Sequence, residues 1–191
     1  MELNALYLQS VRKQLEYYKT IGEKAMAQLE DQQLFAKTND DTNSIATIIK
    51  HLSGNMLSRW TDFLTTDGEK PWRERDAEFE NDLQSSQELQ QVWEKGWQCF
   101  FDALDSLQTQ QLSQIIYIRN EGHTVMEAIN RQLAHYPYHI GQIVFYAKQL
   151  KNSNWDTLSI ARNASRSYND GKFAQEKGIR NFTDDELKRL Q

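Results

Sequence analysis

The chain has 191 residues, of which 39% are hydrophobic and 26% are charged, and its formal net charge is −5. It has no apolar run near the length of a bilayer span and no basic leader before an apolar segment. We therefore expect neither a membrane anchor nor a secretory signal. The acidic balance disfavours nucleic acid as a partner, because the field of the molecule repels phosphate backbones. The single cysteine, Cys99, is typical of a reducing compartment, so we expect a cytoplasmic protein without nucleic-acid or membrane partners.

Apolar residues recur at helical spacing in four long segments, and this pattern predicts four helices. The segments run from about Leu3 to Leu29, from Asn43 or Ser44 to about Phe63, across Leu89 to Leu107, and from Thr124 to about Leu150. Residues 112–123, LSQIIYIRNEGH, are rich in β-branched side chains and predict one short strand segment before the fourth helix.

The connections between these helices predict the topology. Short links make neighbouring helices antiparallel, whereas a long link permits a crossover between parallel helices. Residues 65–82 form the longest link, between the second and third helices. The sequence therefore predicts an all-α fold, a four-helix bundle with one long crossover.

The C-terminal residues lack a long periodic pattern. Residues 152–173 predict an ordered loop, with Trp155 and Leu158 available for packing. A short final helix is expected after it, with Thr183 as N-cap and Glu186 at the capping-box position. We expect a single domain over residues 1–191, with the tail from about residue 151 packed on the bundle.

The fourth helix contains the most unusual segment, RQLAHYPYHIGQ at residues 131–142. A proline inside a helix removes a backbone hydrogen bond, and a break at Pro137 is one interpretation. The apolar stripe nevertheless continues in phase across Pro137, which favours one kinked helix. In such a helix His135 and His139 lie one turn apart on the same face.

Two imidazoles at this spacing can bind one metal ion, although for an isolated pair two hydrogen-bonded structural histidines are the more common case. His51 changes this balance, because it lies at the border of the apolar stripe of the second helix and can face the fourth. Three imidazoles from two helices form a set that leaves coordination positions open, as catalytic metals require. We therefore favour a metal site formed by His51, His135 and His139 over the structural alternative.

The residues KHL at 50–52 and HYPYHIGQIV at 135–144 resemble the metal-binding pattern of the DinB/YfiT-like superfamily of metalloenzymes. The resemblance covers about residues 40–165, includes the segments 51–79 and 123–150, and is closest to a branch of unknown function. It implies an up-down-down-up four-helix bundle, one divalent metal held by His51, His135 and His139, and a homodimer. It also implies either low-molecular-weight thiol S-transferase or metal-dependent hydrolase activity on a small-molecule substrate.

The sequence also indicates which metals would bind, how the chain assembles and what the alternative to an enzyme is. Three imidazoles suit Zn, Ni, Fe, Co or Cu, of which we favour Zn, Ni or Fe. The aromatic residues Trp60, Trp72 and Trp155 lie outside the main stripes and indicate a homodimer interface. A non-catalytic dimeric protein that binds a metal or a small molecule is the alternative to the enzyme.

Arg59, Gln142, His123 and Cys99 are the other residues with a candidate role near the site. Arg59 is expected on the apolar face of its helix, where a guanidinium group requires an anionic partner. An ion pair with an acidic residue, such as Asp62 or one in the crossover, is favoured over a bound anion. Gln142 can reach the site or bind a neighbouring polar atom. His123 is expected outside the site, and Cys99 is expected to be a small buried residue.

Overall fold

The computed structural model describes residues 2–80 and 82–190. In these residues the protein is mostly helical, with seven α-helices, two short 3-10 helices and one small two-stranded sheet. The α-helices are α1 Leu3–Met26, α2 Asp31–Leu34, α3 Ile45–Trp60, α4 Ser86–Ser106, α5 Val125–Lys151, α6 Ser165–Phe173 and α7 Phe182–Leu190. The remaining elements are η1 Asp76–Phe79, η2 Thr109–Ser113, β1 Ile115–Ile118 and β2 Glu121–Thr124. None of the helices in this part of the chain combines the length and apolar character that crossing a membrane requires.

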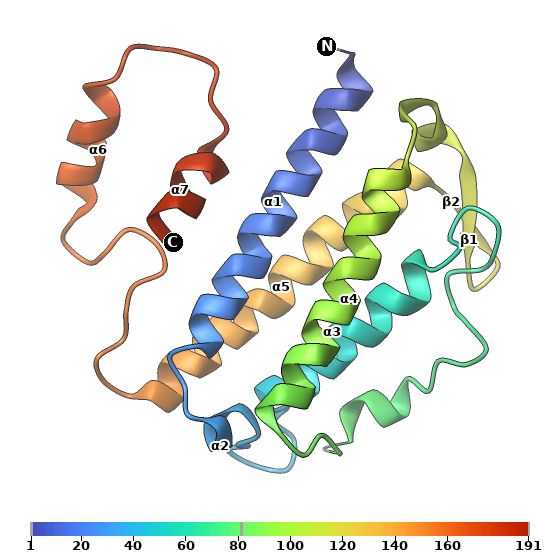
Figure 1. Ribbon diagram of the computed structural model, residues 1–191, viewed down its shortest axis with the longest axis horizontal. Helices are drawn as coiled ribbons and strands as arrows, with labels where there is room; N and C mark the ends of the chain where they lie inside the picture. The colour runs from blue at the N-terminus through green and yellow to red at the C-terminus, as the bar shows by residue number, and fades with distance from the viewer. Residues whose placement is uncertain (1, 81, 191) are drawn as a thin grey trace.

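The four long helices lie side by side around one core. Helix α1 packs against α5, α3 packs against α4, and α3 also contacts α5. Figure 1 shows α1 and α5 running in one direction and α3 and α4 in the other. Because α3 and α4 are parallel neighbours, the chain between them must return along the length of α3 before α4 begins.

The core consists of the apolar stripes that the sequence predicts. The buried stripe residues are Val11, Leu15 and Ala25 of α1, Ile45, Ile49, Leu52 and Met56 of α3, Leu89, Trp93, Trp97 and Phe100 of α4, and Val125, Ile129, Tyr136, Ile140 and Ala147 of α5. The expectation for Trp60 is wrong, because this side chain is only 3% exposed and donates a hydrogen bond to the Tyr136 hydroxyl over 3.0 Å. Trp60 therefore belongs to the core rather than to an interface.

Capping side chains define the starts of the two helices that carry the predicted ligands. The Ser44 hydroxyl accepts a hydrogen bond from the Thr47 amide at the start of α3. At the start of α5, Thr124 and Glu127 form the predicted capping box. Helix α5 continues through Pro137 without interruption, so the prediction of one continuous helix is confirmed.

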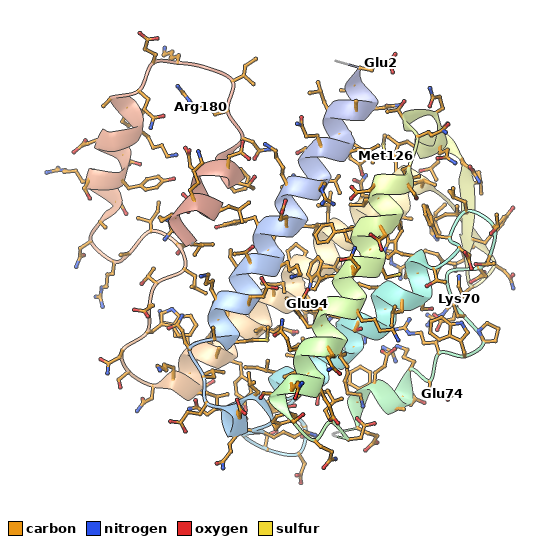
Figure 2. The ribbon with its side chains drawn as sticks, viewed as in Figure 1. Glu2, Lys70, Glu74, Glu94, Met126 and Arg180 are labelled. Carbon is orange, nitrogen blue, oxygen red and sulfur yellow. The ribbon has the colours of Figure 1, made fainter. Side chains whose placement is uncertain are left out.

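The crossover between α3 and α4, described over residues 61–80 and 82–85, runs back alongside α3. Lys70 and Glu74 mark part of its course in Figure 2, and its 3-10 helix η1 contacts α3. The Lys50 ammonium of α3 donates to the backbone carbonyls of Ala77 and Glu80, each over 2.8 Å. These contacts hold η1 against the part of α3 that carries His51.

The segment before α5 forms a hairpin rather than the single predicted strand. Strands β1 and β2 pair antiparallel, with Ile115 opposite Thr124 and Ile118 opposite Glu121. The polar composition of β2 concealed it, because none of its four residues is buried.

The tail differs from expectation at two points. Residues 165–173, predicted as loop, form α6, which buries none of its residues and so carries no apolar stripe that periodicity could reveal. The predicted N-cap Thr183 lies inside α7, because the helix begins one residue earlier at Phe182. Its amide instead donates to the Asn181 side chain over 3.1 Å, in the manner of an N-cap. The expected packing of Leu158 is confirmed, since this residue is 8% exposed.

Candidate metal site

The three predicted histidines converge at the contact between α3 and α5. His51 lies in the second turn of α3, and His135 and His139 lie one turn apart on α5. The centroid of the His51 imidazole ring lies 5.5 Å from that of His135 and 5.0 Å from that of His139. One ring nitrogen from each residue falls within a set whose members all lie within 4.8 Å of one another. The three imidazoles can therefore contact a single ion.

Each imidazole has an oxygen acceptor beside its Nδ1 atom. Nδ1 of His51 lies 2.9 Å from a carboxylate oxygen of Glu78. The amide oxygen of Gln132 lies 3.3 Å from Nδ1 of His135, and that of Gln142 lies 2.7 Å from Nδ1 of His139. An oxygen acceptor at Nδ1 places the proton there in the neutral ring and leaves Nε2 with a free lone pair. This is the arrangement in which metal-binding histidines are usually held.

The Glu78 carboxylate is itself fixed by an arginine. Nε and Nη2 of Arg73 donate to its two oxygens over 2.7 and 3.0 Å, a bidentate ion pair. Burial disfavours the charged form of Glu78, but the hydrogen bonds from His51 and Arg73 outweigh it and hold the pKa of this carboxyl below its usual range. Glu78 is therefore ionised at neutral pH and accepts a hydrogen bond from His51.

A glycine on α3 creates the space for Glu78. A Cβ atom at Gly54 would lie 2.2 Å from Oε1 and 2.7 Å from Cδ of Glu78, far inside van der Waals contact. Phe79 follows Glu78 in η1 and stacks on the His51 ring, with centroids 5.3 Å apart. The crossover thus contacts His51 through both a carboxylate and an aromatic face.

The nitrogen atoms that face the centre of the cluster fit a cation. Nε2 of His135 and Nε2 of His139 lie 3.1 Å apart, so with both protons on Nδ1 two lone pairs face each other. Two such acceptors repel unless a positive ion lies between them. In a tetrahedral zinc site with bonds of about 2.05 Å, adjacent ligand nitrogens lie about 3.3 Å apart. The spacing of His135 and His139 is close to this value.

The electrostatics of the cluster favour neutral imidazoles. Burial, followed by the neighbouring His139 and His51, lowers the pKa of His135 from 6.5 to about 4. Burial also lowers the pKa of His139, although its hydrogen bond with Gln142 opposes this effect. Imidazoles bind metals only when neutral, so these ligand atoms are available at physiological pH.

A cavity of about 220 Å³ adjoins the histidines. Its lining residues are His51, Asn55, Arg59, Arg73, Arg75, Arg119, Arg131, Gln132 and His135. A small molecule in this cavity would contact two of the three imidazoles directly.

Of the other residues that the sequence singles out, some belong to the site and others do not. Gln142 reaches it, through His139. Arg59 pairs with Glu69 of the crossover at 3.0 Å, which confirms the predicted ion pair, and it also lines the cavity. His123 lies on β2 and does not belong to the histidine cluster. Cys99 is only half-buried, near Thr61, and burial raises the pKa of its thiol.

Of the residues that orient the imidazoles, Gln142 was singled out from the sequence, whereas Gln132, Glu78 and Arg73 were missed. Gln132 precedes His135 by three residues, as Gln142 follows His139 by three, so helical spacing alone could have identified it as well. No comparable signal marks Glu78 or Arg73, because the crossover has no periodic pattern and the chain contains 27 acidic residues.

The fold and the cluster define a mostly helical protein with three histidines placed to hold a metal ion. Residues 2–164 match the family model described as "Protein of unknown function (DUF1572)". This match covers most of the 191 residues, and the chain belongs to that family. No curated protein and no solved structure matches the chain.

Proposed function

We propose that this protein is a divalent-metal-dependent enzyme that acts on a small molecule, with His51, His135 and His139 as the metal ligands. The observation that carries the proposal is the convergence of one ring nitrogen from each of three imidazoles, whose Nδ1 atoms all have an oxygen acceptor beside them. A hydrogen-bonded structural cluster would more commonly pair imidazole donors with acceptors, rather than place two Nε2 lone pairs 3.1 Å apart. Zn, Ni and Fe are the favoured ions, since all three accept imidazole ligands.

The proposed fold is the up-down-down-up four-helix bundle of the DinB/YfiT-like superfamily, in a single domain with the tail packed on it. The directions of the four long helices and the position of the long crossover support this assignment (Figure 1). The contact of α7 with α1, which includes an ion pair of 2.7 Å between Lys13 and Asp184, supports the placement of the tail.

The proposed chemistry relies on the metal. A divalent ion held by three imidazoles supplies a Lewis acid that lowers the pKa of a bound water or thiol. The protein contributes the orientation of the imidazoles, through Glu78, Gln132 and Gln142, and a cavity beside them for the substrate. Thiol S-transfer and hydrolysis both use a nucleophile of this kind, and both are retained as the reaction class.

One observation favours the alternative of a protein that binds without turnover. The carboxylates beside the cavity, Glu69 and Glu78, are both engaged in ion pairs with arginines. Neither is a free general base, so any catalysis must depend on the metal itself.

The decisive experiment combines metal analysis with an activity assay on protein purified without a metal-binding tag. About one divalent ion per chain is expected. His51→Ala, His135→Ala and His139→Ala should each lose most of it, while the matched control His123→Ala should retain it. Full occupancy in the double variant His135→Ala/His139→Ala would refute the ligand assignment.

Activity is then compared between metal-loaded and chelated protein, using small electrophiles with and without a low-molecular-weight thiol. Thiol-dependent consumption identifies a transferase, and thiol-independent consumption identifies a hydrolase. Equal rates for loaded and chelated protein would exclude the enzyme in both forms, and a metal-saturated protein inert on every electrophile would favour the binding alternative.

We also propose that the protein is a cytoplasmic homodimer without nucleic-acid or membrane partners. Tyr138 and Phe145 support a dimer interface on α5, because they lie seven residues apart on one helical face and are 62% and 73% exposed. Light scattering at micromolar concentration should give the dimer mass, and a monomer mass would contradict the proposal.

A further inference from the structure

The cavity beside the histidines is lined by five arginines from four different segments. Arg59 comes from α3, Arg73 and Arg75 from the crossover, Arg119 from the turn between β1 and β2, and Arg131 from α5. The whole protein carries a net charge of −5, so this concentration of guanidinium groups is a local exception. A cavity lined by charges of one sign concentrates ligands of the opposite sign.

Two carboxylates compensate part of this charge. Glu69 contacts Arg59 and Arg119, each at 3.0 Å, and Glu78 accepts the bidentate contact from Arg73. Five guanidinium groups outnumber the carboxylates that pair with them, so a net positive charge remains at the cavity. These ion pairs give Arg59, Arg73 and Arg119 a structural role, but they do not neutralise the charge of the cavity.

Asp67, a third carboxylate nearby, is used by the backbone. Its oxygens accept hydrogen bonds from the amides of Arg119 and Asn120, over 2.8 and 2.9 Å, and fix the turn between β1 and β2. Asp67 is not among the residues that line the cavity. It holds Arg119 in position rather than occupying the space in front of the guanidinium groups.

Arg75 of the crossover and Arg131 of α5 both line the cavity. In residues 2–80 and 82–190, neither side chain forms an ion pair. Both residues are exposed, and the Arg75 guanidinium lies 5.5 Å from the centroid of the Phe79 ring. Because Phe79 also stacks on His51, Arg75 is held near the histidine cluster. These two arginines are free to bind a ligand.

We propose that this cavity binds an oxyanionic group, a carboxylate or a phosphate, of the small-molecule substrate. Guanidinium groups bind both oxyanions through paired, charge-assisted hydrogen bonds. The volume of about 220 Å³ is below the roughly 300–1,000 Å³ of pockets for drug-sized ligands, so it suits a compact anionic group. His51 and His135 line the same cavity, which places the anionic group next to the candidate metal site. That the bound anion is part of a substrate rests on the proposed function.

The test measures anion binding by the metal-free protein, after chelation and dialysis. Inorganic phosphate and malonate are titrated separately by calorimetry into wild type, Arg75→Gln, Arg131→Gln and the double variant. Saturable binding of at least one anion is expected in wild type. Loss of one charged hydrogen-bonding partner should weaken it by about tenfold or more in each single variant. The comparison of the two probes identifies the preferred oxyanion.

Arg166→Gln is the matched control, because this arginine is exposed on α6 and does not line the cavity. It should bind the anion as wild type does, and all variants should share the wild-type thermal transition. Absence of saturable binding in wild type, or equal affinity in wild type and the double variant, would overturn the inference.

Metal content of the same preparations before chelation separates this inference from the proposed function. Normal metal content without anion binding refutes the oxyanion site alone. Anion binding by a protein that takes up no metal refutes the metal-dependent function but supports the oxyanion site.

Discussion

The carboxylate of Glu78 lies 2.9 Å from Nδ1 of His51, although 27 residues separate the two in sequence. Glu78 belongs to the crossover and His51 to α3, so the contact joins the crossover to a candidate metal ligand. In a neutral His51 ring this contact places the proton on Nδ1, which leaves the lone pair of Nε2 available to a metal ion. A contact of this kind increases metal affinity, because the ligand does not have to be ordered when the ion binds.

Glu78→Gln should therefore weaken metal binding by about 10- to 100-fold while the protein remains folded. An amide cannot retain the charge-assisted contact with His51, and it also leaves Arg73 without its carboxylate partner. Competition with a chelator of known affinity measures the change. Glu80→Gln, two residues along the crossover at an exposed position, is the control and should bind metal as wild type does.

Gly54→Ala provides a second test of the same contact without changing either partner. The added Cβ would lie 2.2 Å from Oε1 of Glu78, so the carboxylate must leave the position in which its other oxygen contacts His51. Metal affinity should fall, even though alanine favours the helical conformation of α3 by about 1 kcal/mol. Chelator competition and thermal unfolding together separate the two effects. Unchanged metal affinity in this variant would show that Glu78 does not orient His51.

Pro137→Ala should stabilise the protein. Pro137 lies inside α5, where it cannot donate a hydrogen bond to the carbonyl of Leu133. The restored bond and the relieved clash favour alanine by about 3 kcal/mol, and the greater freedom of the unfolded chain offsets up to about 1 kcal/mol of this. Differential scanning calorimetry should show a transition higher by roughly 4–8 °C. Metal content should remain, and its loss would mean that the proline itself directs His135 and His139.

Acid should destabilise the metal-free protein over a defined range of pH. The pKa of His135 is about 4 in the folded protein and about 6.5 in the unfolded chain. Above pH 6.5 the residue is neutral in both states, and its contribution to stability is fully present. As the pH falls from about 6.5 towards 4, the unfolded chain takes up a proton that the folded protein excludes, so the free energy of unfolding decreases.

Urea unfolding of chelated protein between pH 7.5 and 4 measures this decrease. The lowered pKa of His139 contributes in the same direction. In His135→Gln the dependence on pH should be shallower over this range. A variant that follows the wild-type curve would show that His135 titrates equally in the folded and unfolded states.

The features that sequence predicts here are those that depend on helical periodicity. The four long helices follow from apolar stripes, and the pairing of His135 with His139 follows from their spacing of four residues. The convergence of His51 on this pair follows because both positions border buried stripes on helices that pack together. By contrast, α6 buries none of its residues, so its sequence has no apolar stripe from which the helix could be predicted.

The crossover could not be predicted because its conformation depends on single contacts between distant residues. The position of Glu78 depends on the Lys50 contacts with the η1 backbone, on the pairing with Arg73 and on the absence of a side chain at Gly54. None of these contacts repeats along the chain. Of the cavity arginines only Arg59 was singled out from the sequence; the other four were missed for the same reason, since only the fold brings them together.

The separation of the histidines from the crossover has an evolutionary consequence. The imidazoles reside on α3 and α5, whose core-facing positions are constrained by packing, whereas Arg73 and Arg75 of the cavity lining belong to the crossover. Substitutions at exposed crossover positions such as Arg75 can change which ligand the cavity accepts without disturbing the core. New specificities can therefore arise by mutation of one surface segment, while selection on the helices preserves the reactive centre.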